Sequence, residues 1–151
     1  MEEVIINYLN LGKYEELENL LKEKSYREIC NVLIQVGYKT NNIGVIMFVV
    51  YLYEKSKDKI WLEIGSTILD VAFCSFEGGY GAALFINKYL LKEEESFEHL
   101  YNYFMYSTCP DTEDAFSNDE VSELAEKILV TDPHNENVLS ELKRRNININ
   151  Q

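Results

Sequence analysis

The stretch AFCSFEGGYGAALFINKYLL, from Ala72 to Leu91, decides between two folds for this chain. An apolar run leads into Gly78-Gly79-Tyr80-Gly81, and a helical pattern follows. A strand, a glycine-rich turn and a helix in this order are typical of a phosphate-binding loop. The alternative is a bend between two packed helices, and the neighbouring residues distinguish the two.

The glycine pattern lacks the residues that nucleotide-binding loops need. The dinucleotide motif requires a third glycine where Leu84 stands, and no Gly-Lys-Ser/Thr follows for a P-loop. Apolar residues upstream continue a helical spacing from Trp61 through Ile68 to Ala72, so that segment is predicted to be a helix. A bend between helices is therefore favoured, and nucleotide binding is a minor alternative.

The same helical spacing recurs along most of the chain. Apolar faces begin near Val4, Tyr14, Tyr26, Ile43, Trp61, Phe97, Val121 and Val138. Ser25 and Glu28 predict a capping box, Gly37 predicts a helix end, and Asn118 or Asp119 is expected to cap a later helix.

These segments predict an all-α fold of about nine helices. Short loops between them favour antiparallel helical hairpins, stacked as a short solenoid of the TPR or HEAT kind. A compact helical bundle is the alternative, because the repeat period is irregular. We expect one helical domain over residues 1–145 and a frayed tail over 146–151.

The net charge of the chain indicates which classes of molecule it could bind. The 151 residues carry 26 acidic and 14 basic side chains, a net charge of −12. Such a field repels phosphate backbones and anionic lipids, so neither nucleic acid nor a membrane surface is predicted as a partner. A basic protein would be attracted. The alternative is that the charge serves solubility alone.

The cysteines and the apolar runs predict a cytoplasmic protein. Cys30, Cys74 and Cys109 are odd in number and form no C-x-x-C motif, which is typical of reduced thiols. The start of the chain lacks the basic region of a signal peptide. The longest uncharged apolar run, Ile43–Tyr53, is short of the ~20 residues that a membrane span needs.

No pattern of catalytic or metal-binding residues is present in the sequence. His99 and His134 stand at no ligand spacing with each other or with a cysteine. The loop Asp111–Glu120 lacks the glycine of an EF-hand, so a solvated acidic loop is favoured over a cation site. We therefore expect no enzyme activity, no cofactor and no metal; an enzyme is the third hypothesis.

One region combines acidic residues with tyrosines, a composition typical of a surface that binds a basic protein. The predicted partner-binding residues are Glu93, Glu94, Glu95, Glu98, Asp111, Glu113, Asp114, Asp119 and Glu120, with Tyr101, Tyr103 and Tyr106 as anchors. The alternative is that some of these rings belong to the core, because the helix that carries them is aromatic nearly all round.

Three segments together resemble a known family: NYLNLGKYEELENLL, EGGYGAALF and EVSELAEKILVTDPHNENVLSEL. The family comprises small bacterial α-helical proteins that are similar in architecture to tetratricopeptide-type repeats. Its members are found beside polymorphic toxins and act as immunity proteins in contact-dependent growth inhibition. The resemblance extends from about Tyr8 to Leu142. The chain departs from it at Ile86, where the family often has histidine, and at Lys92–Glu95, where an Asp-Pro turn would be expected.

This resemblance implies an immunity protein that binds and neutralises a cognate toxin C-terminal domain by blocking its active site. The toxin is expected to be a basic nuclease, specifically an RNase, and the immunity protein a monomer when free. The second hypothesis is a TPR-like adaptor that binds a peptide in a concave groove.

Overall fold

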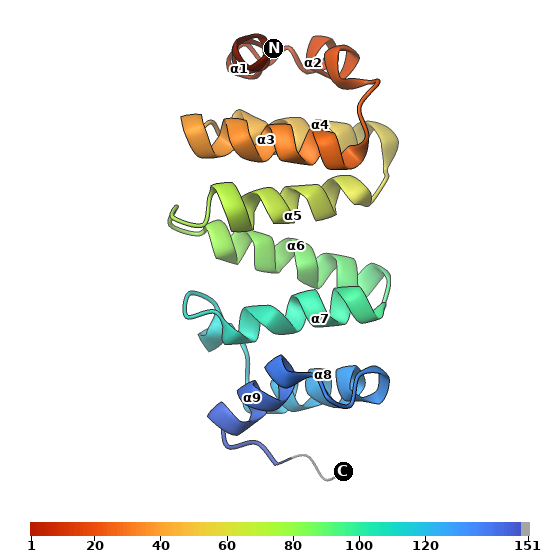
Figure 1. Cartoon of the computed structure of the whole chain (residues 1–151), viewed down its shortest axis with the longest axis vertical. Helices are drawn as coiled ribbons and strands as arrows, with labels where there is room; N and C mark the ends of the chain where they lie inside the picture. The colour runs from red at the N-terminus through yellow and green to blue at the C-terminus, as the bar shows by residue number, and fades with distance from the viewer. Residues whose placement is uncertain (149–151) are drawn as a thin grey trace. The chain divides into compact units, whose positions relative to one another are not determined.

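The structure is a computed structural model and describes residues 1–148. Within them all regular secondary structure is helical, which confirms the all-α prediction. The α-helices are α1 (Glu2–Asn10), α2 (Tyr14–Leu21), α3 (Tyr26–Thr40), α4 (Gly44–Ser56), α5 (Ile60–Ala72), α6 (Gly79–Glu93), α7 (Phe97–Met105), α8 (Asn118–Thr131) and α9 (Glu136–Arg144) (Figure 1). Two short 3-10 helices, η1 (Tyr106–Thr108) and η2 (Glu113–Ala115), lie between α7 and α8.

The structure groups the chain into two compact units, and the prediction of one helical domain over residues 1–145 stays a prediction. The N-terminal unit is Met1–Ile86 and the C-terminal unit is Asn87–Gln151, so the division falls inside α6. Part of the predicted frayed tail, residues 149–151, lies outside the described residues.

In the N-terminal unit, α5 packs against both α3 and α4, and α1 contacts α2, α3 and α4 (Figure 1). Apolar side chains from α1 to α5 are buried in its core, and burying each large one contributes roughly 1.5–3 kcal/mol. The most deeply buried include Ile5, Leu17, Leu21, Leu33, Val36, Val45, Phe48 and Ile68.

Helix α3 begins where the sequence predicts and ends later. The Ser25 hydroxyl accepts a hydrogen bond from the Glu28 amide, and the Glu28 carboxylate accepts one from the Ser25 amide, which confirms the capping box. The predicted end at Gly37 is wrong, because the helix continues to Thr40. Gly37 instead allows close packing: a Cβ there would lie 3.1 Å from the ring of Phe73.

The stretch Ala72–Leu91 contains a tight turn between α5 and α6. Gly78 adopts a positive φ of 83°, which favours glycine. A Cβ at Gly79 would lie 2.2 Å from the main-chain oxygen of Phe73, so the turn requires a residue without a side chain there. The helical interpretation of this stretch is confirmed, since residues 60–72 and 79–93 are helices.

In the C-terminal unit, α7 packs against α8, and α8 packs against α9. Helices α7 and α8 run antiparallel: Glu95, just before α7, pairs with Lys127 late in α8, and Tyr103, late in α7, bonds Glu120 early in α8. The predicted cap of α8 is wrong by one residue, because Ser117 accepts the capping hydrogen bond from the Glu120 amide.

A buried ion cluster joins α9 to the segment between α7 and α8. The Glu141 carboxylate is 4% exposed as a residue and accepts hydrogen bonds from Arg144 at 2.7 Å and Arg145 at 2.6 Å. Arg145 also donates to main-chain oxygens of this segment, among them that of Ser107 at 2.8 Å. Arg144 pairs with the Glu113 carboxylate of η2 at 2.7 Å. The cluster therefore fixes the loop that carries Asp111 and Asp114.

Because of this buried ion cluster, we expect the free energy of unfolding to fall in acid. Hydrogen bonds from Arg144 and Arg145 hold the pKa of the Glu141 carboxyl below its usual range. The contribution of the ionised Glu141 carboxylate to the free energy of unfolding is fully present above the pKa that this carboxyl has in the unfolded chain. This contribution is lost as the pH falls below about 4. Urea midpoints of the wild type and Glu141→Gln should therefore differ at pH 7 and converge in acid. A difference that stayed constant from pH 7 to pH 3 would contradict this assignment.

Candidate functional site

The predicted acidic residues fall into two groups at opposite ends of the α7–α8 pair. The first acidic group is Glu93, Glu94, Glu95 and Glu98, around the start of α7. The second acidic group is Asp111, Glu113, Asp114, Asp119 and Glu120, beyond the end of α7 and at the start of α8. The nine residues of α7 separate the groups by about 13 Å along the helix axis. The predicted acidic residues therefore form two separate groups rather than one continuous acidic surface.

Charge is concentrated in the C-terminal unit. It has 14 acidic and 6 basic side chains, a net charge of −8, whereas the N-terminal unit has 12 and 8, a net charge of −4. The smaller unit thus carries two thirds of the net charge. This makes it the stronger attractor of a basic partner.

Three of the nine carboxylates are engaged within the fold. Glu95 pairs with Lys127 at 3.1 Å, Glu113 with Arg144 at 2.7 Å, and Glu120 accepts the Tyr103 hydroxyl at 2.9 Å. The other six are exposed and make no ion pair with any residue of the described chain: Glu93, Glu94, Glu98, Asp111, Asp114 and Asp119. These six are the carboxylates that a partner could reach.

The three tyrosines divide between core and surface. Tyr103 is 5% exposed and packs on Phe116 with ring centroids 5.1 Å apart; Tyr106 is 6% exposed and accepts a hydrogen bond from Asn87. Burial, with the hydrogen bond to Glu120, raises the pKa of the Tyr103 hydroxyl. Both rings therefore offer a partner little surface, as the core alternative anticipated.

Tyr101 differs from the other two tyrosines because it is only half-buried. Its ring stacks on Phe97 with centroids 6.1 Å apart, and its hydroxyl accepts a hydrogen bond from Asn137. Phe97 is 40% exposed. The Phe97–Tyr101 pair is thus the aromatic surface that lies next to the first acidic group.

The histidines and acidic residues show no grouping of metal ligands in the described chain. Within residues 1–148, no three or more His, Cys, Asp or Glu side chains gather where they could hold a metal ion. The ring of His99 is buried, and its Nδ1 atom lies 2.8 Å from the main-chain oxygen of Glu94. This contact ties the start of α7 to the preceding loop.

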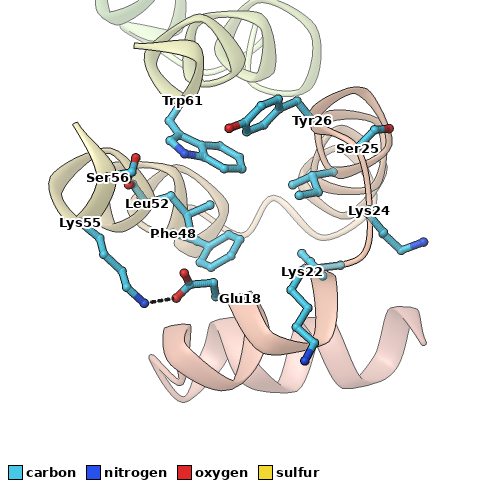
Figure 2. Close-up of a pocket in the computed structure, with 12 residues that line it drawn as sticks. Glu18, Lys22, Lys24, Ser25, Tyr26, Phe48, Leu52, Lys55, Ser56 and Trp61 are labelled. Atoms are coloured by element: carbon cyan, nitrogen blue, oxygen red, sulfur yellow. Dashed lines mark hydrogen bonds and ion pairs between the residues drawn. The ribbon is translucent and has the colours of Figure 1, made fainter. Parts of the chain in front are cut away.

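Sequence reasoning missed a pocket in the N-terminal unit. Its volume is about 580 Å³ (Figure 2). Four helices and one loop contribute its lining: Glu18, Leu21, Lys22, Lys24, Ser25, Tyr26, Ile29, Phe48, Leu52, Lys55, Ser56 and Trp61. No single segment of the sequence indicated this pocket, because the residues that line it are spread between positions 18 and 61.

Comparison with protein-family models, with curated proteins and with solved structures found no match to this chain. Among the helices within residues 1–148, none has both the length and the apolar character that crossing a lipid bilayer requires.

Proposed function

We propose that the protein is an immunity protein that acts in the cytoplasm, where it binds and neutralises a cognate toxin domain without catalysis of its own. The partner is a basic nuclease, specifically an RNase of a contact-dependent growth inhibition system. The observation that carries the proposal is the set of six exposed, unpaired carboxylates at the two ends of the α7–α8 pair. The family resemblance supplies the class of partner.

The charge of a nuclease makes it a suitable target for this surface. A nuclease must present positive charge to hold a phosphate backbone, and carboxylates on helix ends can occupy the same site. The Phe97–Tyr101 pair adds an apolar contact beside the first acidic group. Charge of this kind speeds encounter, so association should be fast at low salt and slower at high salt.

The direct test is a binding titration against the C-terminal domain encoded immediately upstream of this protein. We expect a nanomolar complex, and co-expression should restore growth to cells that produce the domain. Absence of binding by a fully helical preparation would refute the pairing. A short linear peptide that bound as tightly as the whole domain would favour the adaptor hypothesis instead.

Charge reversal should locate the interface on this surface. One variant changes Glu93, Glu94 and Glu98 to lysine, and a second changes Asp111, Asp114 and Asp119. We expect at least one of them to weaken toxin binding about a hundredfold, because attraction becomes repulsion at the contact. Calorimetric titration measures the affinity, and circular dichroism checks that the helices persist.

The matched control reverses three exposed carboxylates of the N-terminal unit, Glu3, Glu15 and Glu23. It changes the net charge by the same amount but leaves both acidic groups intact. We expect an affinity within about threefold of the wild type, because distant exposed charges are screened. Equal losses in all three variants would show that net charge, not this surface, determines binding.

A further inference from the structure

Aromatic rings from three helices line the pocket of the N-terminal unit. Tyr26 of α3 meets Trp61 of α5 edge to face with ring centroids 5.0 Å apart, and its hydroxyl donates to Asp58 at 3.0 Å. Figure 2 shows these two rings on one side of the hollow and the ring of Phe48 on the other. Phe48 itself packs against Tyr14 with centroids 5.8 Å apart. The rings are therefore held in place by contacts within the protein.

Aliphatic side chains complete the apolar lining. Leu21, Ile29 and Leu52 lie around the hollow, and each is less than 9% exposed. The volume of about 580 Å³ lies within the range of ~300–1,000 Å³ that is usual for small-molecule sites. Apolar hollows are poorly hydrated and take up apolar molecules in preference to water. The pocket thus offers a ligand apolar contact from four helices.

The polar groups of the lining are already bonded within the protein. The Glu18 carboxylate accepts a hydrogen bond from Lys55 at 2.6 Å. The Ser25 hydroxyl belongs to the capping box of α3, and the Ser56 hydroxyl donates to a main-chain oxygen of α4 at 2.8 Å. These groups therefore need no partner from a ligand.

The two other lysines of the lining, Lys22 and Lys24, bring no charge into the hollow. Figure 2 shows their ammonium groups pointing away from the hollow and from each other. Lys24 also interacts with the Glu28 carboxylate. Among the described residues of the lining, none presents an unpaired charge to the interior, so burying an ionic group of a ligand there would be costly.

We infer that this pocket binds a small uncharged aromatic molecule, held between the ring of Phe48 and the Tyr26–Trp61 pair. The rings favour an aromatic body, because edge-to-face and offset contacts between rings add to the gain from burying apolar area. The internal bonding of the polar lining selects against a charged ligand. The site lies in the N-terminal unit and is independent of the acidic surface proposed to bind the toxin.

The uncharged aromatic dye N-phenyl-1-naphthylamine tests the proposal on the full chain. Trp61 is the only tryptophan in the chain and lines the pocket, so energy transfer from Trp61 to a bound dye reports binding. We expect saturable transfer with one dye molecule per chain. Absence of saturable transfer would overturn the proposal.

Three competitors with the same naphthalene body measure the preference for an uncharged ligand. 2-Methylnaphthalene is neutral, 2-naphthoate is an anion and 2-naphthylmethylammonium is a cation. We expect the neutral compound to displace the dye at a roughly tenfold lower concentration than either ion, because no lining group pairs with an ion. An ion that competed as well as the neutral compound would show an ionic anchor and contradict the proposal.

Substitutions locate the dye in the pocket. Tyr26→Ala removes part of the aromatic lining at a position that is 47% exposed, so the helices should persist while the dye binds about tenfold more weakly. Ile29→Phe adds atoms within the hollow and should weaken the dye by about as much. Circular dichroism checks that both variants fold.

The matched control is Tyr38→Ala. It removes another exposed tyrosine of α3, one that does not line the pocket, and should leave the affinity for the dye within about twofold of the wild type. The proposal is overturned if Tyr26→Ala binds the dye as tightly as the wild type. Equal losses in Tyr26→Ala and Tyr38→Ala would place the dye elsewhere and overturn it too.

Discussion

Replacing Gly79 by alanine is expected to destabilise the N-terminal unit by about 3 kcal/mol or more. The added Cβ would lie 2.2 Å from the main-chain oxygen of Phe73, and this neighbour is backbone rather than a flexible side chain. The turn between α5 and α6 must therefore open. Urea unfolding followed by Trp61 fluorescence measures the loss, because Trp61 lies on α5 within the same unit.

Gly81 provides the matched control, two residues further along. A Cβ there meets nothing within 4 Å, and the residue lies inside α6. Gly81→Ala should stabilise the protein by about 0.5–1 kcal/mol, because alanine favours the helix more than glycine does. If both substitutions shifted the urea midpoint in the same direction, the close approach at Gly79 would not be what constrains this turn.

Glu141→Ala is expected to cost about 3–5 kcal/mol in the free energy of unfolding. The substitution removes the carboxylate that Arg144 and Arg145 share, and it leaves the largely buried guanidinium of Arg145 without a countercharge. The segment with Ser107 and Glu113 should loosen as well, since Arg145 bonds their main-chain oxygens. Urea unfolding and hydrogen exchange of this segment measure the two effects.

The control for this substitution is Glu123→Gln on α8. Glu123 pairs with Lys127 at 3.5 Å, but its side chain is 72% exposed. Exposed ion pairs of this kind contribute little, so we expect a change within about 0.5 kcal/mol. A loss at Glu141 as small as this would mean that the buried cluster does not hold α9 to the loop.

The helical fold could be predicted because its signals are local. Spacing of apolar residues marks each helix, and the reciprocal bonds of Ser25 and Glu28 are encoded within four residues. Gly37 led to a wrong prediction of the end of α3, because its role depends on a contact with a distant part of the chain. Gly37 lies inside α3, where Phe73, 36 residues later, approaches it closely. The residues next to Gly37 in the sequence do not predict this contact.

The sequence could predict which acidic residues form the candidate surface, but not which of them pair with basic residues of the fold. The sequence identifies the carboxylates, whereas the pairing of Glu95 with Lys127, or of Glu113 with Arg144, depends on how the helices pack. Tyr103 faces the core for the same reason. The pocket was missed because its lining comes from α2, α3, α4, α5 and the loop before α3, and no single segment contains the pattern.

The separation between paired and unpaired carboxylates bears on how such a protein could evolve. Glu113 pairs with Arg144 of the buried cluster, and Glu120 accepts the hydroxyl of the buried Tyr103, so changes at these two positions would be selected against through loss of folding. Glu93, Glu94 and Asp114 carry no such constraint, and single changes at these positions should be nearly neutral for stability. A lineage could therefore drift toward a new partner through these positions while the scaffold stays constant. Sister proteins would then differ most at the two ends of the α7–α8 pair.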